Sequence, residues 1–346
     1  MRAVVFAGEG HVAVDDVPEP KIVDDGDAVV RVTKTSICGS DLHLLDGKTP
    51  GMEVGSVIGH EFVGVVEESS GSAPGEGTRV LGAFLIACGT CSQCTSHRYN
   101  FCRNRRALGL GSMTGDLDGA QAELVRVPNA GLNLRPLLGD IESDESVLFA
   151  GDILATGFYA AEVAGVAAGN TVAVIGAGPV GLCAAMALST RKPAELLLLD
   201  ADPHRVEFAA SLGFEAIDVS DIDAQAAVAG RTNGAMADSA LDAVGSIPAF
   251  KSAMRCVRDG GRVAVIGVYG AERYEFPMGM AWIRGLDVRF SGMANVHAHW
   301  NEALDNIHAG TIDPTKMVTH RIPLDEAVEG YRLFAEREAV KVVMTP

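Results

Sequence analysis

The segment from Thr171 to Leu188 restricts the possible folds of this 346-residue chain more than any other. It contains a short apolar strand, a glycine-rich turn and an apolar helix, in that order. A second apolar strand, Leu196–Asp200, ends in an acid 19 residues after Gly181. This order of strand, turn, helix and acid is the fingerprint of a dinucleotide-binding βαβ unit. We therefore expect the turn to contact a dinucleotide through Gly176, Gly178, Pro179, Val180 and Gly181.

Each of the three glycines in this turn has a physical role. Gly176 allows the tight turn, and Gly178 lets the backbone approach the pyrophosphate. Gly181 lets the helix and the strand pack closely. The N-terminus of the helix would then face the phosphates, because its free N–H groups attract anions.

The acid at the end of the second strand bears on the choice between NAD and NADP. Asp200 stands where a carboxylate accepts hydrogen bonds from the ribose hydroxyls of the adenosine. A phosphate at that position would be repelled by Asp200 and by Asp202. Arg205 is the counter-evidence, although it could equally flank the ribose of NAD. The balance favours NAD.

Strand signals alternate with helical ones after this unit. Further strands are expected at Leu241–Gly245, Gly261–Val268 and Leu286–Met293. Val268, at the end of its strand, is expected to contact the cofactor. Repeated strand–helix alternation predicts a parallel, doubly wound sheet.

The first part of the chain has a different pattern. Residues 1–35 alternate between apolar and polar side chains, and strand signals resume in Phe62–Glu67, Arg79–Phe84 and Ala122–Val127. Helical signals are few until a helix expected from Ile153 to Ala168. This part is therefore expected to form an antiparallel, barrel-like β domain. After Asn295 we expect a helix from His299 to Ala309, a strand at Val318–Pro323, a helix from Leu324 to Arg337 and a last strand at Val340–Met344.

The segment Ser36–Glu61 carries a thiol, an imidazole and a carboxylate at Cys38, His60 and Glu61. These are ligand types of a catalytic zinc, which keeps one position open for water or substrate. Because Cys38 and His60 are far apart in sequence, only a fold can bring them together. Taken alone, the constellation is suggestive, since a lone Cys or His is more often part of a core.

A second metal signal is local. Four cysteines follow the spacing C-x2-C-x2-C-x7-C, and we expect them to bind a structural zinc: Cys88, Cys91, Cys94 and Cys102. Four thiolates complete a tetrahedral shell and leave no position open for chemistry. A redox or iron–sulfur site is the alternative.

Composition excludes several classes of protein. Asp and Glu outnumber Lys and Arg by 45 to 28, a formal net charge of −17. This charge argues against nucleic acid and against an anionic membrane as partners, because both attract basic surfaces. The N-terminus lacks the apolar core of a signal peptide, and clustered cysteines favour metal over disulfides. We therefore expect a cytoplasmic location.

Together the three motifs resemble those of the zinc-containing medium-chain alcohol dehydrogenase family. They are Cys38 with Gly59-His60-Glu61, the four-cysteine array, and the Gly176–Gly181 turn. The resemblance implies an α/β protein with two domains. A GroES-like β-barrel catalytic domain would comprise residues 1–153 and 296–346, and a Rossmann doubly wound parallel-sheet NAD-binding domain residues 154–295.

The resemblance also implies a ligand set for the catalytic zinc. Cys38 and His60 match ligands, and Asp152 stands where many members have a third ligand. Glu61 is a direct ligand in some members and an outer group that swings in for others, so both roles stay open. Asp41 resembles the carboxylate that orients the liganding histidine. The chain would thus hold two zinc ions, one catalytic and one structural.

Other residues match groups around the substrate and the cofactor. Ser40 resembles the hydroxyl that takes the proton of the alcohol, and His43 the histidine that completes the proton relay. A solvated surface histidine is the alternative for His43. Thr156 resembles a nicotinamide contact, and Lys341 a contact of the cofactor phosphates. On resemblance alone, the substrate pocket would be lined by Phe84, Leu110, Tyr269 and Trp282.

The implied function is reversible oxidation of an alcohol to a ketone or aldehyde, with hydride transfer to NAD. Gly39, the Ser40/His43 pair and Asp152 favour secondary alcohols. Three alternatives remain: a polyol or amino-alcohol dehydrogenase like sorbitol or threonine dehydrogenase, a zinc-free quinone or enone reductase that uses NADPH, and a non-catalytic NAD-binding protein. The expected partners are a small alcohol or ketone and further copies of the chain, in a homotetramer more than a dimer.

Overall fold

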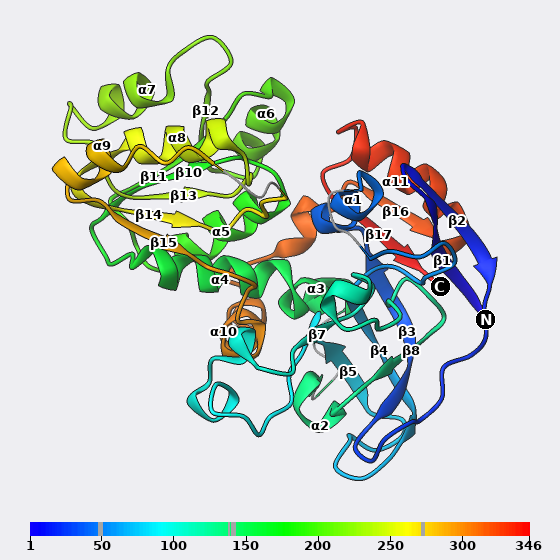
Figure 1. The fold of residues 1–346 in the computed structure, drawn as a ribbon. Coiled ribbons are helices and arrows are strands. Elements are labelled where there is room, and N and C mark those ends of the chain that lie inside the picture. Colours follow the sequence, from blue (N-terminus) through cyan, green and yellow to red (C-terminus); the bar gives the residue numbers. More distant parts are fainter. Residues whose placement is uncertain (48–50, 138, 140–142, 271–273) are drawn as a thin grey trace. The chain divides into compact units, whose positions relative to one another are not determined.

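The computed structural model describes residues 1–47, 51–137, 139, 143–270 and 274–346. Contacts within the chain divide it into two compact units (Figure 1). The first unit comprises Met1–Ala155 and Asn295–Pro346, and the second comprises Thr156–Ala294.

The second unit is built on a parallel β-sheet. Its strands, in their order across the sheet, are β12 (Glu215–Asp218), β11 (Glu195–Asp200), β10 (Thr171–Ile175), β13 (Ala237–Asp242), β14 (Val257–Val265) and β15 (Asp287–Phe290). Every neighbouring pair among these described strands is parallel. The inner strand β10 is apolar and buried from Val172 to Ile175, as strands covered on both faces are. This sheet confirms the predicted doubly wound α/β fold.

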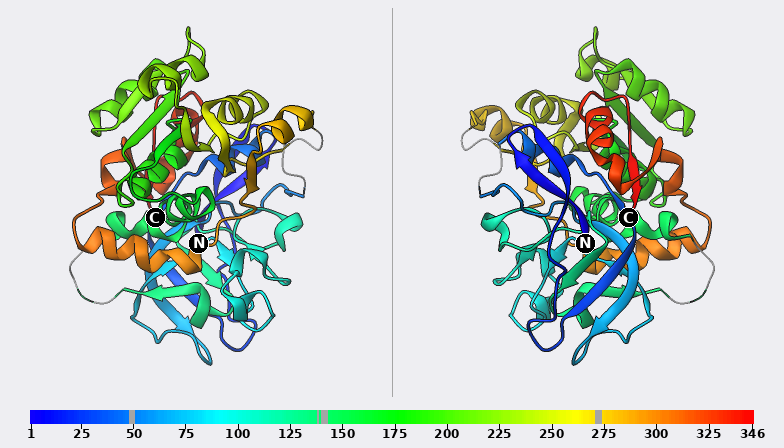
Figure 2. Two further views of the ribbon diagram at one scale, coloured as in Figure 1. Left: turned by 90° about the vertical axis from the view of Figure 1, so that its left-hand side faces the viewer. Right: turned by 90° about the vertical axis from the view of Figure 1, so that its right-hand side faces the viewer.

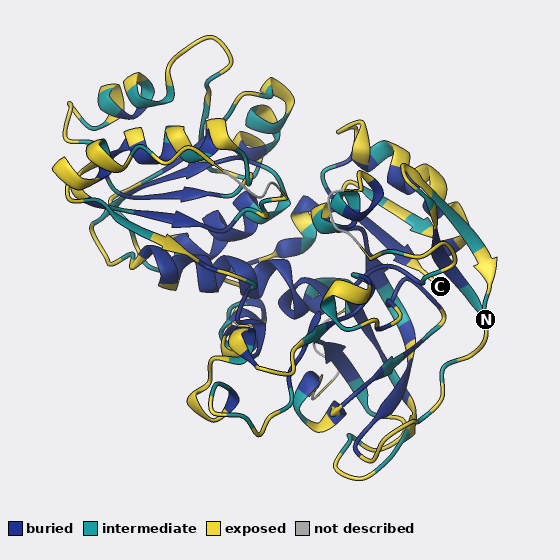
Figure 3. Ribbon diagram, in the orientation of Figure 1, coloured by how far each residue is buried: buried dark blue, intermediate teal, exposed yellow. Residues whose placement is uncertain are grey.

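Helices cover both faces of this sheet. In Figure 1, α4 (Ile153–Ala164) and α5 (Pro179–Ser189) lie on one face, and α7 (Ala224–Arg231) and α8 (Ile247–Cys256) lie on the other. The remaining helices of the unit are α6 (Pro203–Ser211) and α9 (Met278–Ile283). Figure 3 shows that the inner strands are buried and that the outer faces of the helices are exposed.

The first unit is built mainly on antiparallel strands. Its largest sheet has the order β16 (His320–Pro323), β17 (Val342–Thr345), β3 (Ala28–Ser36), β4 (Glu61–Ser69), β5 (Arg79–Gly82) and β9 (Leu134–Pro136), and β8 (Leu124–Val127) also pairs with β3. Of these pairs, β16–β17 is parallel and the others are antiparallel. Two further antiparallel pairs complete it: β1 (Arg2–Gly8) with β2 (His11–Asp16), and β6 (Leu85–Ile86) with β7 (Arg106–Ala107).

The helices of the first unit are short, apart from one. They are α1 (Gly39–Leu45), α2 (Ala130–Asn133), α3 (Asp144–Leu148), α10 (Val296–His308) and α11 (Ala327–Ala335). Helix α11 packs beside β2, as Figures 1 and 2 show. Its buried Tyr331 belongs to an apolar cluster with Val4 and Phe6 of β1. The C-terminal segment therefore completes the core of the N-terminal strands.

Two helix boundaries differ from those expected. The helix predicted to run from Ile153 to Ala168 ends at Ala164, because Gly165 takes a left-handed conformation with φ of +61°. The helix predicted to begin at His299 begins at Val296. Among the described residues, no single helix is long and apolar enough to cross a membrane, although the bent pair Asp144–Gly151 and Ile153–Ala164 meets the length and composition criteria together.

The contact between α4 and α5 gives a test of the packing. A Cβ atom on Gly157 would lie 2.4 Å from the backbone oxygen of Cys183, so Gly157→Ala must push the two helices apart. We expect it to lower the free energy of unfolding by about 1–3 kcal/mol. Gly279→Ala is the matched control, because a Cβ there meets nothing within 4 Å. Urea unfolding of both variants checks the expectation, and an equal effect of the two would contradict it.

Candidate metal and cofactor sites

The pairing of β3 with β4 brings Cys38 and His60 together. The two strands are antiparallel, and Ser36 at the end of β3 is opposite Glu61 at the start of β4. The residues just beyond these ends must therefore lie at the same edge of the sheet. Cys38 caps the N-terminus of α1, where its backbone N–H donates to Asp41 Oδ2 at 3.0 Å. The chain thus turns from strand to helix at the thiol.

Asp152 completes a group of three metal-ligand side chains. It follows a 3₁₀ turn at Phe149–Gly151 and immediately precedes α4. Its Oδ2 lies 3.3 Å from His60 Nε2 and 3.5 Å from Cys38 Sγ. The ligand atoms of these three buried residues all lie within 4.8 Å of one another. The structure therefore brings together the three residues predicted as catalytic-zinc ligands.

The electrostatics of this group favour a positive charge at its centre. Burial by itself would lower the pKa of His60, but Asp41 and Asp152 outweigh it and raise this pKa well above the ordinary value. Burial, Asp152 and Glu61 raise the pKa of Cys38. Burial works against the charge on Asp152, yet His60 lowers the pKa of that carboxyl. A buried thiol, imidazole and carboxylate that prefer a shared cation fit a zinc ion.

Glu61 lies beside this group but is held by other partners. Ser36 Oγ donates to its Oε2, and Lys341 Nζ lies 2.5 Å from the same atom. Lys341 also donates to the carbonyl oxygen of Ile37 at 2.8 Å, and its ammonium lies 5.4 Å from the ring centroid of Phe149. Burial raises the pKa of Glu61 to about 7, although Lys341 opposes the rise. These contacts place Glu61 outside the three-ligand group.

Lys341 was expected to contact the cofactor phosphates, and in this structure its ammonium contacts Glu61. Its side chain is completely buried, and the residue immediately precedes β17, which pairs with β3 on the side opposite β4. Burial by itself would lower the pKa of Lys341, but the negative charge of Glu61 outweighs it and raises this pKa. In this structure its ammonium compensates a buried carboxylate.

The predicted proton-relay residues both lie on α1. Ser40 Oγ lies 3.1 Å from His60 Nε2, the nitrogen that faces the ligand group. His43 is half-buried and lies three residues further along the helix. Side chains at this spacing are neighbours on a helix surface. The relay itself stays a prediction.

The four-cysteine array also comes together. Among the described residues its four sulfur atoms form the second group that could hold a metal, all within 4.8 Å of one another. Cys91 Sγ lies 3.6 Å from Cys94 Sγ and 3.9 Å from Cys102 Sγ. Backbone N–H groups lower the pKa of Cys91 to about 6, whereas burial raises that of Cys94 to about 12. A metal that holds all four as thiolates must displace the protons that remain.

The glycine-rich turn has the geometry that its spacing predicted. Gly176 has φ of +103°, and a Cβ on Gly181 would lie 1.9 Å from the carbonyl oxygen of Gly176. Helix α5 then begins at Pro179 with Gly178 as its N-cap. Only glycine fits at Gly176 and Gly181, so the turn stays tight and the helix N-terminus stays open to an anion.

Asp200 is anchored against this turn. It accepts hydrogen bonds from the backbone N–H of Ala177 at 2.7 Å and of Asp202 at 2.9 Å. Arg205 lies near the turn as well, because its Nη1 would be 3.6 Å from a Cβ on Gly178. Val268 is exposed, and Thr156 is buried in α4. The acid and the arginine that bear on NAD and NADP therefore both adjoin the turn.

The expected pocket residues have different environments. The Phe84 ring meets the His60 ring edge to face, with centroids 6.0 Å apart. Leu110 is half-buried. Tyr269 donates its hydroxyl to Asp242 and to the carbonyl oxygen of Ser246. Trp282 is 80% exposed on α9, which does not support a role in lining a pocket. Phe84 is thus the member of this set that contacts the ligand group.

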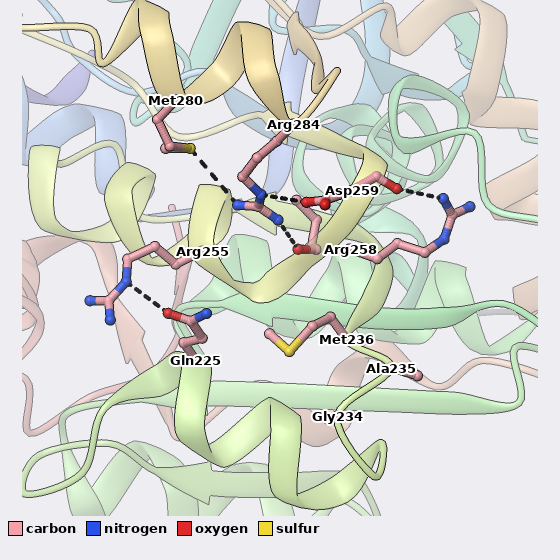
Figure 4. Close-up of a pocket in the computed structure, with 10 residues that line it drawn as sticks. Gln225, Gly234, Ala235, Met236, Arg255, Arg258, Asp259, Met280 and Arg284 are labelled. Carbon is pink, nitrogen blue, oxygen red and sulfur yellow. Dashed lines mark hydrogen bonds and ion pairs between the residues drawn. The ribbon is translucent and has the colours of Figure 1, made fainter.

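A cavity of about 610 Å³ lies elsewhere in the second unit, among α7, α8 and α9 (Figure 4). Its arginines are held by protein acceptors: Arg255 by Gln225, Arg258 by Asp238 and Arg284 by Asp259. The described residues that line it include none of the predicted site residues. The arginines therefore brace the fold around this cavity.

Two buried residues near the ligand group had no role in the sequence analysis. Gln121 Nε2 donates to Asp41 Oδ2 at 3.1 Å, and Tyr331 donates its hydroxyl to Gln121 Oε1 at 2.8 Å. Gln121 lies between two alanines in a strand-like segment, and Tyr331 lies on a C-terminal amphipathic helix. Neither pattern carries a signal of its own, since only the fold brings them to Asp41.

Comparisons with known proteins identify the family of this chain. Residues 24–136 match the alcohol dehydrogenase GroES-like domain, and residues 179–309 match the zinc-binding dehydrogenase domain. The uncharacterized zinc-type alcohol dehydrogenase-like protein AdhB of Bacillus subtilis is 34% identical, over the full length of both chains. The chain belongs to the zinc-containing medium-chain alcohol dehydrogenase family. The prediction made from the three motifs is confirmed.

Solved structures place the dehydrogenase in the same family. The alcohol dehydrogenase TADH from Thermus sp. ATN1 is 42% identical, with a TM-score of 0.96 and full coverage of both chains. A zinc-binding dehydrogenase from Sinorhizobium meliloti, solved bound to NADP, is 29% identical with a TM-score of 0.85, and the match covers 100% of this chain and 99% of that one. These relatives support zinc and a nicotinamide cofactor.

The family settles the class of reaction. This chain is a zinc-dependent alcohol dehydrogenase, an oxidoreductase that acts on alcohols, and its relative from Cupriavidus necator is described as an alcohol dehydrogenase. That relative is 32% identical, and the match covers 100% of this chain and 99% of its own. The alternatives of a polyol or amino-alcohol dehydrogenase and of a non-catalytic protein are not favoured.

The buried Lys341–Glu61 pair gives a test of the site. Lys341→Met leaves the Glu61 carboxylate buried without its cation, and we expect the free energy of unfolding to fall by about 3–5 kcal/mol. The double variant with Glu61→Gln removes the stranded charge and should recover most of the loss. Arg31→Met is the control: it breaks an exposed ion pair to Glu67 on the same two strands and should cost less than about 1 kcal/mol. Urea unfolding measures all three, and a double variant no better than Lys341→Met would contradict the expectation.

Proposed function

We propose that this dehydrogenase oxidises a secondary alcohol reversibly to a ketone, with NAD as the hydride acceptor. The observation that carries the proposal is the convergence of Cys38 Sγ, His60 Nε2 and Asp152 Oδ2 in a buried group. One thiolate, one imidazole and one carboxylate would hold a zinc ion and leave a position for the alcohol. A zinc bound there supplies Lewis acidity that lowers the pKa of the alcohol.

Two zinc ions per chain are part of the proposal. The catalytic ion is assigned to Cys38, His60 and Asp152, with Glu61 retained by Lys341 as an outer group. The structural ion is assigned to the four-cysteine array, whose closed shell would stabilise its lobe. We assign the catalytic domain to residues 1–153 and 296–346 and nucleotide binding to residues 154–295.

The residues of α1 would move the proton of the alcohol. Ser40 Oγ can both donate and accept, and its 3.1 Å distance to a ligand nitrogen supports a position next to the substrate oxygen. We assign Ser40 as the group that accepts the alcohol proton and His43 as the group that passes it towards solvent. Thr156 is assigned to the nicotinamide.

Contacts around the glycine-rich turn support NAD. The turn would hold the pyrophosphate at the N-terminus of α5, and Asp200, with Arg205 beside it, would bind the adenosine ribose. Val268 is assigned as a further contact of the cofactor. Nicotinamide supplies the hydride acceptor, and the protein positions it. The contact of Lys341 with the cofactor phosphates stays a prediction, and in this structure its ammonium is held by Glu61.

Features next to the three-ligand group support a secondary alcohol as substrate. Gly39 has no Cβ, and one placed there would meet nothing within 4 Å, so space remains at the N-terminus of α1. The Phe84 ring against His60 adds an apolar surface. A ketone carbon carries two carbon substituents, and an apolar, uncrowded site suits both.

We propose that the protein is a homotetramer in the cytoplasm. Large apolar side chains are exposed at the edge strand β15 and the helix α9 that precedes it: Met278, Trp282, Ile283 and Phe290. An exposed apolar patch at the edge of a sheet supports association with further copies. All seven cysteines lie in the described part of the chain as free thiols, which supports a reducing compartment.

A single thiol substitution tests the proposed reaction. Cys38→Ser should lower the zinc content from two ions per chain to one and abolish turnover, while the thermal unfolding temperature stays close to that of the wild type. Turnover is followed by NADH absorbance with primary, secondary, polyol and amino alcohols. Cys256→Ala, a buried thiol outside both metal groups, should keep both ions and the activity. Undiminished activity in Cys38→Ser would show that this site is not the catalyst.

The choice of cofactor has its own test. Asp200→Ala removes the charge that would repel a ribose phosphate, so the ratio of kcat/KM for NAD over NADP should fall by about tenfold to a hundredfold, equivalent to about 1–3 kcal/mol. Asp218→Ala is the control, because Asp218 ends the neighbouring strand β12 in register with Asp200. Steady-state kinetics with both cofactors decide. An unchanged ratio in Asp200→Ala would remove this residue from its role.

A further inference from the structure

A buried chain of side chains runs from the C-terminal helix to the histidine of the ligand group. Tyr331 on α11 donates to Gln121, and Gln121 donates to Asp41. The other carboxylate oxygen of Asp41, Oδ1, lies 3.2 Å from His60 Nδ1. We propose that Gln121 is a positioning residue for the catalytic metal: it holds Asp41, which orients His60, and Tyr331 holds Gln121. The inference rests on the proposed catalytic zinc site.

The amide of Gln121 can be oriented in one way only. Both hydrogens of Nε2 are used, one on Asp41 Oδ2 and the other on the carbonyl oxygen of Ser36, each at 3.1 Å. Both of these partners are acceptors, so a flipped amide would place oxygen against oxygen twice. The remaining Oε1 needs a donor, which the Tyr331 hydroxyl supplies at 2.8 Å. Burial and Asp41 raise the pKa of Tyr331, so the hydroxyl keeps its proton.

The two carboxylate oxygens of Asp41 have different partners: Oδ2 accepts hydrogen bonds, and Oδ1 faces His60. Its Oδ2 accepts from Gln121 and from the backbone N–H of Cys38 at 3.0 Å. These two bonds fix the plane of the carboxylate and turn Oδ1 towards His60 Nδ1. With Nδ1 facing a carboxylate, Nε2 is the nitrogen presented to Cys38 and Asp152. Gln121 therefore sets the ring orientation through Asp41 without touching the ligand group.

Burial strengthens the hydrogen bonds that join Tyr331, Gln121 and Asp41. Asp41 and Gln121 are completely buried, and Tyr331 and His60 are nearly so. Hydrogen bonds in such surroundings meet little competition from water, and an unmade one is costly. Tyr331, Gln121 and Asp41 come from three separate segments, so the C-terminal helix is linked to His60 through two intermediate side chains.

The absence of a side chain at Gly59, the residue before His60, leaves the space that the Gln121 side chain occupies. A Cβ on Gly59 would lie 2.2 Å from Gln121 Cγ, and Gly59 has φ of +87°. No other residue type fits both the left-handed backbone and this close approach. The Gly59–His60 step in the motif is therefore explained by the passage of the Gln121 side chain.

The test compares the release of zinc from two variants. Gln121→Met keeps the volume and removes the donors, and Tyr331→Phe removes one hydroxyl and leaves Gln121 in place. Loss of outer-shell partners weakens metal sites by about 10–100-fold, so we expect release of the catalytic zinc to a chelator to be about tenfold faster in Gln121→Met and about threefold faster in Tyr331→Phe. The absorption bands of the Co²⁺-substituted holoenzyme should shift in both, because the ligand geometry changes.

Tyr159→Phe is the matched control. It removes an equally buried hydroxyl, which donates to the carbonyl oxygen of Ser291 in the second unit. It should release zinc at the wild-type rate and keep the Co²⁺ spectrum. A comparable shift in this control would mean that loss of any buried hydroxyl disturbs the metal, and would overturn the inference.

A double-mutant cycle shows whether Gln121 acts through Asp41. In an Asp41→Asn background, Gln121→Met should add little to the rate of zinc release, because residues that act through one another are not additive. Additive effects would overturn the inference, as would wild-type release from both folded single variants. A wild-type protein that holds zinc only in the four-cysteine array would overturn the catalytic-metal assignment itself, and the inference with it.

Discussion

The antiparallel pairing of β3 with β4 is the interaction on which the ligand group depends. With Ser36 opposite Glu61, the residues that leave β3 and those that enter β4 meet at one edge of the sheet. A slip of one residue would turn every side chain of a strand to the opposite face and separate Cys38 from His60. β17, on the other side of β3, adds Lys341 to the same edge. Three strands thus deliver a thiol, an imidazole, a carboxylate and an ammonium to one place.

Charge compensation explains why so many ionisable groups are buried there. Isolated charges are costly to bury, so each needs a partner. Glu61 is matched by Lys341, while Cys38, His60 and Asp152 share a preference for a cation at their centre. The first pair stabilises the fold, and the second group is the one proposed to hold the catalytic metal. This division separates Glu61 from the ligands, although it directly follows His60 in sequence.

The two halves of the chemistry were predictable to different degrees. The glycine-rich turn is a local motif, since its strand, turn and helix are contiguous, and its geometry at Gly176 and Gly181 follows from the spacing. The four-cysteine array is local too. The proposed catalytic ligands come from three distant segments, so Cys38, His60 and Asp152 could be named by resemblance but not by spacing. For Lys341 the sequence did not indicate Glu61 as a partner, because strand pairing, which the sequence does not display, decides what a buried lysine meets.

From residue order and side-chain chemistry alone, the sequence determined the α/β class, the parallel sheet, the cysteine lobe and the glycine-rich turn. Each depends on periodicity or on residues close together in the chain. Tertiary structure alone decided that Glu61 is bound by Lys341, that Trp282 is exposed, and that Gln121 and Tyr331 reach Asp41. Those contacts join residues up to 280 positions apart, and they arise from strand register and helix packing, which only the folded chain defines.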